Sequence, residues 1–228
     1  MVRLGSTLSE LHEQEMGVPQ GSILSLALFS IKINDIVKAV LKGMDCSLFV
    51  DDFALCVSGK MLNRVERAMQ LCVNSVQKWV SENGFKFSTS KTVCIHFHQQ
   101  YIFSPDPNIL LGKTPIKVVK ETKFLGLIFD TKLTFKNHIH YLKTSCQKAL
   151  DILRIVGHTN WGANRIVLLC LYRSLVHSKL DYGCIVYRSA RRSVLKQLDP
   201  IHHQGLRIAL GAFRTSPAQS LYLSLIHI

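Results

Sequence analysis

Two adjacent aspartates, Asp51 and Asp52, interrupt an apolar run that extends from Cys46 to Val57. The flanking residues predict two short strands, 47–50 and 53–57, so the pair lies at the junction of a β-hairpin. Like charges in a partly buried position repel each other and resist desolvation unless a positive group compensates them. A divalent metal ion supplies that charge, because Mg²⁺ takes one or two carboxylates together with substrate phosphates. Taken alone, however, an Asp-Asp pair more often belongs to a turn or a helix cap.

The apolar pattern predicts helices on both sides of this hairpin. Residues 22–42 are apolar on nearly every turn, which predicts a largely buried helix with Ser22 as its N-cap and Gly43 at its end. Apolar residues between 62 and 79 recur at three- and four-residue intervals. They predict an amphipathic helix that ends at Asn83-Gly84.

The second half of the chain changes from strand to helical periodicity. Residues 116–119 and 124–129 predict a strand pair, and helical stripes follow over 137–153, 166–177 and 193–210, the last interrupted at Pro200. We therefore expect an α+β fold with a mixed domain over residues 1–130 and a helical domain over 131–228.

The formal net charge of +13 lies entirely in the C-terminal part of the chain. Residues 1–90 hold nine Lys/Arg and nine Asp/Glu, whereas residues 91–228 hold nineteen and six. A basic helical region predicts binding to a nucleic-acid backbone, since neutralising phosphates releases counterions. We expect Arg191, Arg192 and Lys196 to contact that backbone. A lysine-rich face that only keeps the protein soluble would give the same composition.

Composition argues against a membrane or secreted protein. Hydrophobic residues make up 47% of the chain, but the longest apolar stretch, 23–33, contains Ser25, Ser30 and Lys32 and falls short of the roughly 18 residues that a transmembrane helix needs. The N-terminal segment lacks the apolar core of a signal peptide. The seven cysteines are scattered, with none in C-x-x-C spacing, and are typical of reduced thiols. We therefore expect an intracellular protein.

Several short motifs occur in a fixed order along the chain. Gly17-Val-Pro-Gln-Gly-Ser-Ile-Leu-Ser25 precedes Phe49-Val50-Asp51-Asp52, and these are followed by Asn83-Gly84-Phe85-Lys86, Ser90-Lys91-Thr92 and Phe124-Leu125-Gly126. Later strings are Leu133-Thr134-Phe135, His138-Ile139, Trp161-Gly162-Ala163, Leu180-Asp181-Tyr182-Gly183 and Leu210-Gly-Ala-Phe-Arg-Thr-Ser-Pro217. Over residues 2–221 this order resembles the reverse transcriptases of non-LTR (LINE-type, jockey-like) retrotransposons.

The resemblance implies a fold and an activity. The fold is a partial right-hand polymerase palm, an antiparallel sheet with packed helices, followed by a mostly helical thumb and extension. The activity is RNA-directed DNA polymerisation with Mg²⁺ or Mn²⁺, an RNA template, a DNA primer and dNTP substrates. The protein of such an element is expected in the nucleus and the cytoplasm.

The resemblance also implies roles for individual residues. Asp51 and Asp52 match the paired aspartates that bind catalytic metal, and Lys91 matches a lysine that could protonate or bind the pyrophosphate leaving group. The family's loop that lies against the incoming nucleotide and template corresponds to Gln20, Gly21 and Ser22. Its primer-grip turn corresponds to Leu125 and Gly126.

Four departures from the family pattern bear on activity. Leu26 stands where proline is usual, and Val50 stands where the family usually has alanine. The family's other metal-binding aspartate belongs to a Phe-Asp strand upstream of Gly17, and we expect this chain to lack it together with the fingers. Phe129-Asp130 has the same two letters but follows the primer-grip turn, so we reject Asp130 as a third ligand. Residues 223–228 do not continue the family pattern.

These departures leave alternatives open. We expect little polymerase activity from this polypeptide alone, and a catalytically inactive nucleic-acid-binding remnant is the second interpretation. A relative of group II intron maturases shares the same palm logic, but the Trp161-Gly-Ala and Leu210–Pro217 strings count against it.

Overall fold

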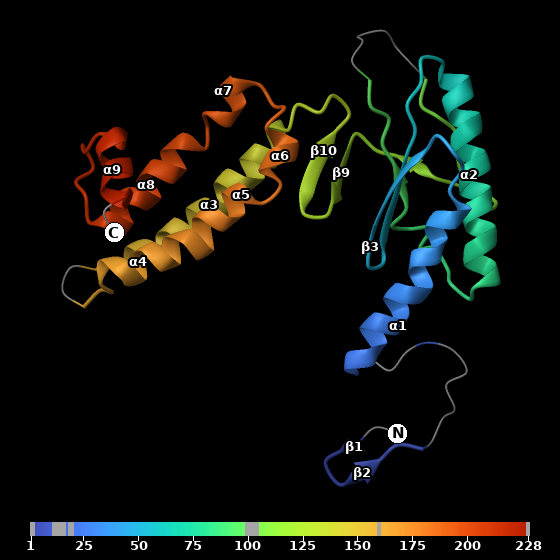
Figure 1. The fold of residues 1–228 in the computed structure, drawn as a ribbon, viewed down its shortest axis with the longest axis horizontal. Helices are drawn as coiled ribbons and strands as arrows, with labels where there is room; N and C mark the ends of the chain where they lie inside the picture. The colour runs from blue at the N-terminus through green and yellow to red at the C-terminus, as the bar shows by residue number, and fades with distance from the viewer. Residues whose placement is uncertain (1–2, 11–16, 18–20, 99–104, 159–160, 227–228) are drawn as a thin grey trace. The chain divides into compact units, whose positions relative to one another are not determined.

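The computed structural model describes residues 3–10, 17, 21–98, 105–158 and 161–226 (Figure 1). The chain forms two compact units, Met1–Cys94 with Ser104–Val118 and Ile95–Phe103 with Val119–Ile228. The predicted domain boundary lies at 130/131, after the hairpin of β9 (Glu121–Phe124) and β10 (Leu127–Asp130), whereas the second compact unit includes that hairpin. The assignment of a palm to 1–130 and a thumb to 131–228 stays a prediction.

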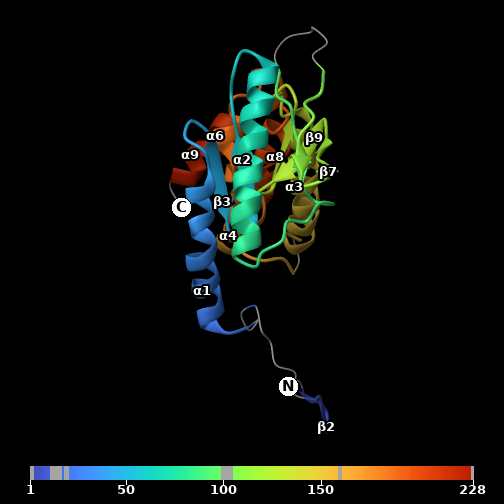
Figure 2. The ribbon, with the colours of Figure 1, turned by 90° about the vertical axis from the view of Figure 1, so that its right-hand side faces the viewer.

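The first unit is built around one hairpin and one long helix. Strands β3 (Asp45–Phe49) and β4 (Asp52–Cys56) pair antiparallel, and α2 (Leu62–Glu82) lies alongside them (Figures 1 and 2). Alternate hairpin residues pack with the buried face of α2 because successive strand side chains point to opposite sides. This core comprises Leu48, Phe53 and Leu55 from the hairpin with Cys72, Val76 and Val80 from α2.

Shorter elements complete the first unit. They are β1 (Arg3–Leu4), β2 (Thr7–Leu8), α1 (Ile23–Asn34), the 3₁₀ helix η1 (Asp35–Ala39), β5 (Val93–Cys94), β6 (Leu110–Leu111), β7 (Thr114–Pro115) and β8 (Lys117–Val118). β5 and β8 pair parallel, while β1–β2 and β6–β7 are antiparallel pairs. The helix predicted over 62–79 is thus confirmed as α2, with Asn83 as its C-cap and Gly84 at a φ of +75°.

The prediction of a largely buried helix over 22–42 is wrong. Helix α1 ends at Asn34, and Ser25 is its one buried residue, whereas Ile23 is 94% exposed. The helix is apolar on every side, so burying it would require neighbours all round. Within the described part of the first unit, the ring of Phe29 meets that of Phe85, and Ile36 of η1 enters the core.

The second unit begins with a hairpin and continues as a helical bundle. Its elements are β9 (Glu121–Phe124), β10 (Leu127–Asp130), α3 (Lys136–Val156), α4 (Arg165–Tyr172), the π-helical turn η2 (Arg173–His177), α5 (Ser178–Asp181), α6 (Cys184–Tyr187), α7 (Arg192–Leu195), α8 (Asp199–Leu210) and α9 (Ala218–Ile226). Buried residues of α3, α4, α8 and α9 form its main core. Gly205 permits close packing here, since a Cβ at that position would lie 2.4 Å from the Tyr172 ring.

Two predictions for this unit need correction. Residues 116–119 do not pair with 124–129; β8 pairs with β5, and β9 pairs with β10 around a turn at 125–126. The helix over 193–210 is two helices, and Pro200 lies in the first turn of α8 instead of interrupting it. Proline suits that position because its missing N–H would be unpaired there in any case. None of the described helices combines the length and apolar character that crossing a bilayer requires.

The Asp130 carboxylate organises the loop that leads into α3. Oδ1 accepts hydrogen bonds from the N–H groups of Lys132 (3.1 Å) and Thr134 (3.0 Å), and Oδ2 accepts from the N–H of Phe135 (2.7 Å) and the Thr134 hydroxyl (3.2 Å). Burial alone would raise the pKa of Asp130, but these hydrogen bonds stabilise the charged form and hold the pKa below its usual value. The same loop holds Leu133 and Phe135 at left-handed φ angles of +51° and +54°.

We expect Asp130→Asn to lower the free energy of unfolding of the second unit by about 1–2 kcal/mol at pH 7, because an amide cannot accept all four bonds. The folded pKa lies below the unfolded value of roughly 3.9, so this contribution is complete above about pH 5 and is lost as the pH falls through the folded pKa. Urea unfolding followed by far-UV circular dichroism at pH 7 and pH 3 measures the difference between the two proteins.

The control is Asp151→Asn, which removes an exposed carboxylate paired with Arg154. Exposed ion pairs contribute little, so this variant should unfold close to wild type at both pH values. An Asp130→Asn deficit that is equally large at pH 3 and pH 7 would contradict the charged-acceptor role.

Candidate active site

The two aspartates lie at the loop of the β3–β4 hairpin. Phe49 pairs with Asp52, which leaves Val50 and Asp51 as a two-residue loop. Strand alternation turns Leu48 toward the core and therefore places Phe49 and Asp52 on the opposite, exposed face. The predicted hairpin with the acidic pair at its junction is confirmed.

Both carboxylates are exposed, so the premise that they occupy a partly buried position is wrong. Neither carboxylate forms a hydrogen bond or an ion pair with another described residue. Water therefore reduces their mutual repulsion, and their oxygens remain available to a cation. The described residues contain no group of three His, Cys, Asp or Glu placed to hold a metal ion. Two free carboxylates fit a hard divalent cation that completes its shell with water and phosphate.

The hairpin loop is strained at Val50. Its φ is +54°, a left-handed value that is unfavourable for β-branched side chains. Among the described non-glycine residues, this conformation otherwise occurs only at Leu125, Leu133 and Phe135. Strain of this kind often occurs next to functional residues, and here it lies beside the acidic pair.

An exposed aromatic ring accompanies the carboxylates. Phe49 is 61% exposed and lies directly across the hairpin from Asp52. Side chains at such cross-strand positions have Cβ atoms roughly 5 Å apart. No role for Phe49 was predicted from the sequence, although the alternation of apolar residues along 45–49 could have shown that it faces away from the core.

The segment before α1 is described in part. Gln20, a predicted template contact, lies outside the described residues. Gly21 has a φ of +92° with open space where a Cβ would stand, so glycine serves conformation here and not close packing. Ser22 is confirmed at the N-cap position, where its carbonyl accepts from the Ser25 N–H at 3.2 Å, but its hydroxyl makes no capping bond.

Lys91 lies in a tight turn that leads into β5. The Ser88 carbonyl accepts hydrogen bonds from the N–H groups of Lys91 (3.2 Å) and Thr92 (2.9 Å) and from the Thr92 hydroxyl (2.8 Å). The Lys91 side chain is exposed, and no hydrogen bond or ion pair links it to another described residue. The turn fixes its backbone and leaves its ammonium group free to reach an anion.

The predicted tight turn at Leu125-Gly126 is present in the second unit. Phe124 pairs with Leu127, and the two loop residues have φ angles of +45° and +80°, the signs of a type I′ turn. The Tyr182 hydroxyl donates a hydrogen bond to the Leu125 carbonyl at 2.7 Å. A Cβ on Gly126 would lie 3.0 Å from the Tyr182 ring, so glycine permits this contact.

Gly183 continues the same contact. A Cβ at this position would lie 2.6 Å from a methyl group of Leu127. The Leu180-Asp-Tyr-Gly183 string therefore packs on the β9–β10 turn. Tyr182 and Leu125, which form the hydrogen bond, are 57 positions apart in the chain. The order of motifs in the sequence identifies both segments but does not predict that they touch. Local periodicity carries no information about contacts between residues so far apart in the chain.

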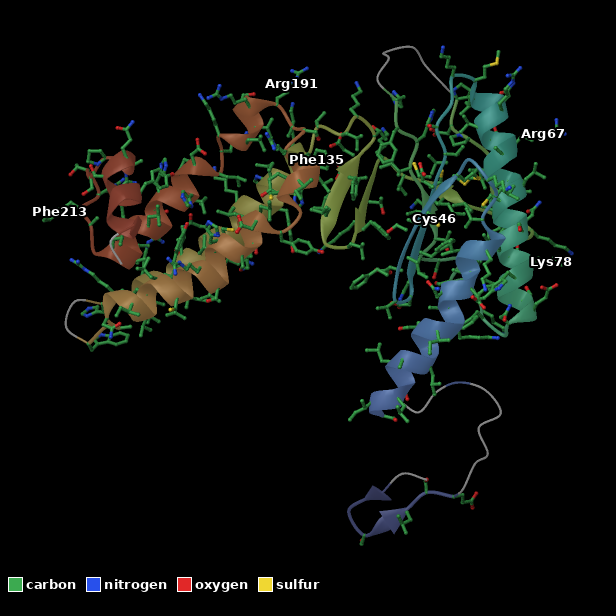
Figure 3. The ribbon with its side chains drawn as sticks, viewed as in Figure 1. Cys46, Arg67, Lys78, Phe135, Arg191 and Phe213 are labelled. Atoms are coloured by element: carbon green, nitrogen blue, oxygen red, sulfur yellow. The ribbon has the colours of Figure 1, made fainter. Side chains whose placement is uncertain are left out.

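The predicted backbone-binding cations are exposed. Arg191 precedes α7 (Figure 3), and Arg192 and Lys196 follow on that helix and at its C-cap. Arg188 is exposed as well, and none of the four forms an ion pair with a described residue. The second unit as a whole holds sixteen Lys/Arg and five Asp/Glu, against twelve and ten in the first.

Comparison with known proteins agrees with this arrangement. The model of the family described as reverse transcriptase (RNA-dependent DNA polymerase) matches residues 3–129. The chain belongs to the reverse transcriptase family. The matched residues include the β3–β4 hairpin with its acidic pair and the β9–β10 turn.

Several curated relatives are RNA-directed DNA polymerases or Pol polyproteins of mobile elements. A Pol polyprotein of the type-1 retrotransposable element R1 from Bradysia coprophila is 27% identical over 75% of this chain and 17% of its own length. The RNA-directed DNA polymerase of mobile element jockey from Drosophila melanogaster is 26% identical over 86% and 22%. A protein of the same organism, named as the probable RNA-directed DNA polymerase from transposon X-element, is 24% identical over 92% of this chain and 23% of its own length.

The resemblance to reverse transcriptases of non-LTR retrotransposons is thereby confirmed. The chain spans less than a quarter of the length of these three relatives. No solved structure matches it significantly.

We expect Val50→Gly to raise the free energy of unfolding of the first unit by about 1 kcal/mol, because glycine adopts a positive φ without the Cβ clash. The measurement is urea unfolding followed by Trp79 fluorescence in a Trp161→Phe background, where Trp79 is the remaining tryptophan. Trp79 packs against the core beneath the hairpin. Val50→Ala serves as the intermediate case, and a Val50→Gly protein less stable than the parent would show that the loop is not strained.

Proposed function

We propose that this chain is part of an RNA-directed DNA polymerase of a non-LTR retrotransposon. The observation that carries the proposal is the exposed Asp51–Asp52 pair at a strained hairpin loop, in a chain whose family match includes that hairpin. The fold we assign is a partial right-hand palm over residues 1–130 and a basic helical thumb with its extension over 131–228.

The reaction we assign is attack of a primer 3′-hydroxyl on the α-phosphate of a dNTP, with release of pyrophosphate. Asp51 and Asp52 would hold divalent metal, Mg²⁺ or Mn²⁺, which when bound activates the attacking oxygen and stabilises the leaving one. Asp51 projects from the loop and Asp52 from the first position of β4, so the two carboxylates approach a substrate phosphate from one end of the hairpin.

The remaining predicted residues would position substrates. Lys91 would neutralise or protonate the pyrophosphate, and Gln20, Gly21 and Ser22 would line the incoming nucleotide and the template. Leu125 and Gly126 would contact the primer backbone from a turn that Tyr182 holds in place. We further propose that the protein acts in the nucleus and the cytoplasm, where such an element meets its RNA and its target DNA.

A second candidate is a catalytically inactive nucleic-acid-binding remnant. The observation that favours it is the absence, among the described residues, of a third carboxylate grouped with the acidic pair. Asp130 is not a substitute, because both of its oxygens are committed to the loop before α3. This candidate retains the basic second unit and its affinity for phosphates.

Primer extension on an RNA template with Mg²⁺ separates the two candidates. For the polymerase we expect weak synthesis from this chain alone, and Asp51→Asn should reduce it by at least roughly 10²-fold, since a metal ligand is removed. Asp45→Asn, which removes another exposed carboxylate of the same hairpin, should leave it unchanged. Broadening by Mn²⁺ of amide NMR signals at 49–53 gives a readout independent of synthesis. Salt-sensitive binding without extension or broadening would instead support the remnant.

The charge distribution predicts which cations hold a duplex. Replacing Arg191, Arg192 and Lys196 with glutamine should reduce the slope of log affinity against log salt by about 2–3, close to one for each phosphate that is no longer neutralised. Fluorescence anisotropy of a labelled RNA–DNA duplex at several salt concentrations measures that slope. Glutamines at Lys60, Arg64 and Arg67, three exposed cations of the first unit, provide the matched control. If both triple variants had the same slope of log affinity against log salt, residues 191–196 would not be part of the duplex-binding surface.

A further inference from the structure

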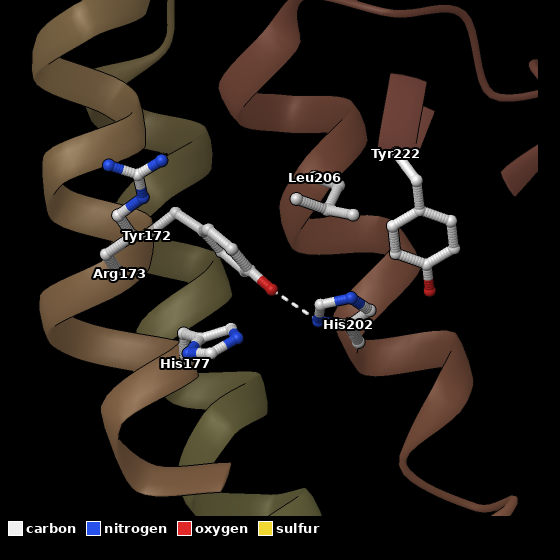
Figure 4. A pocket seen from close by; sticks show the side chains of 6 residues that line it. All are labelled: Tyr172, Arg173, His177, His202, Leu206 and Tyr222. Carbon is white, nitrogen blue, oxygen red and sulfur yellow. Dashed lines mark hydrogen bonds between the residues drawn. The ribbon is translucent and has the colours of Figure 1, made fainter. Parts of the chain in front are cut away.

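A cavity of about 430 Å³ opens on the second unit, among residues to which no role in synthesis is assigned above. It is lined by Tyr172, Arg173, His177, His202, Leu206 and Tyr222 (Figure 4). These side chains come from α4, η2, α8 and α9. The volume falls within the roughly 300–1,000 Å³ that is common for small-molecule sites. No motif assigned above accounts for this combination of aromatic rings, imidazoles and a guanidinium.

The inner wall of the cavity is rigid. Tyr172 and Leu206 are buried in the core of the bundle, 2% and 0% exposed. A Cβ on Gly205 would lie 2.4 Å from the Tyr172 ring, so α8 approaches this ring as closely as glycine allows. A ligand would therefore meet a preformed surface, which reduces the entropy lost on binding.

Tyr222 forms an aromatic platform at the opening. Its ring stacks on that of His202, with centroids 5.7 Å apart and planes at 24°, and its hydroxyl hydrogen-bonds with His203 Nε2 at 3.1 Å. These two contacts fix the ring, yet the residue is 42% exposed. One face thus rests on His202, and part of the ring is open to a planar ligand.

His202 presents a hydrogen-bond donor beside this platform. Burial raises the pKa of Tyr172, so its hydroxyl stays protonated. Burial, and then the neighbouring His177 and His203, lower the pKa of His202, so its ring is neutral at pH 7. We assign the hydroxyl of Tyr172 as donor to His202 Nδ1 (Figure 4), which leaves the imidazole proton on Nε2.

Arg173 adds a positive charge to the lining of the cavity. Arg173 is exposed and forms no ion pair with a described residue. Two carboxylates of this unit could compete for the guanidinium. That of Asp181 is 2.8 Å from His177 Nδ1. Asp199 lies at the start of α8, the helix that carries His202. The guanidinium therefore remains available to an anion in a unit with a large excess of positive charge.

The imidazoles do not form a metal site. A ring nitrogen of each histidine already has a partner. His177 is paired with the Asp181 carboxylate, and hydrogen bonds link His202 to Tyr172 and His203 to Tyr222. Within the described residues no three potential ligands converge on a common point. The ring system is instead a stacking surface on which His202 offers its Nε2–H as a donor.

We propose that this cavity binds an unpaired nucleobase together with its phosphate, as part of a single-stranded nucleic acid. The base stacks on Tyr222, His202 Nε2–H donates to an acceptor on the base edge, and Arg173 pairs with the phosphate. Aromatic platforms combined with cations are the general means of holding single strands, because every base offers a π-face. The proposal is independent of polymerase activity, since it concerns binding at a site outside the acidic hairpin.

Binding of a single-stranded RNA that contains 2-aminopurine tests the proposal in the whole chain. We expect Tyr222→Leu to weaken binding about tenfold and to abolish the change in 2-aminopurine fluorescence, because stacking on one residue contributes roughly a 5- to 150-fold effect. Arg173→Gln should reduce the salt slope by about 0.7, the value for one phosphate of a single strand. Affinity for an RNA–DNA duplex should not change in either variant.

The matched controls are Tyr141→Leu and Arg214→Gln. Tyr141 lies on α3 and is 43% exposed, close to the value for Tyr222. Tyr222→Phe keeps the ring and loses only the hydroxyl, so it should retain most of the affinity and also reports whether α9 still folds. Equal losses for the Phe and Leu variants, or for Tyr141→Leu and Tyr222→Leu, would overturn the proposal.

Two competitors distinguish the source of the base. If adenosine monophosphate displaces the RNA from wild type and shifts the His202 NMR signals, the same chemistry is served by a free nucleotide. If poly-glutamate displaces the RNA and Tyr222→Leu weakens both ligands equally, the site recognises anions without stacking, and the proposal fails.

Discussion

The second unit depends on one carboxylate. Asp130 gathers four donors from the five residues that follow it, and so fixes a loop in which two residues without glycine's freedom take left-handed angles. That loop sets where α3 begins, and α3 provides the buried stripe on which the other helices pack. A chain that could not hold Leu133 and Phe135 in these conformations would misalign the hairpin and the bundle together.

The β3–β4 and β9–β10 hairpins both close with two-residue loops, but they accommodate a positive φ in different ways. The β9–β10 turn uses Gly126 at one of its two positive φ angles and adds a hydrogen bond from Tyr182. The β3–β4 loop carries its positive φ on Val50, which has neither glycine's freedom nor such an external bond among the described residues. The loop at the acidic pair is thus the less stable of the two, as is common where a site stores strain.

Sequence patterns predicted those elements whose structure is determined by residues close together in the chain. The stripe on α2, the start of α3, the acidic hairpin and the tight turn at 125–126 all follow from spacing or motif order within short windows. The exposure of α1 could not be predicted, because apolar composition indicates what a helix can bury and not what surrounds it. The motif order argues against Asp130 as a metal ligand, but its four hydrogen bonds depend on loop angles that no sequence pattern reports.

The contact between Tyr182 and Leu125 has a consequence for synthesis of the chain on the ribosome. The turn emerges first, and its hydroxyl partner follows 57 positions later. At a translation rate of roughly 5–20 residues per second, the nascent hairpin waits about 3–11 s before the tyrosine can reach it. During that interval a two-stranded hairpin is marginal in water. A reading frame interrupted between the two positions would therefore yield the turn at 125–126 without Tyr182, and so without the hydrogen bond that stabilises it.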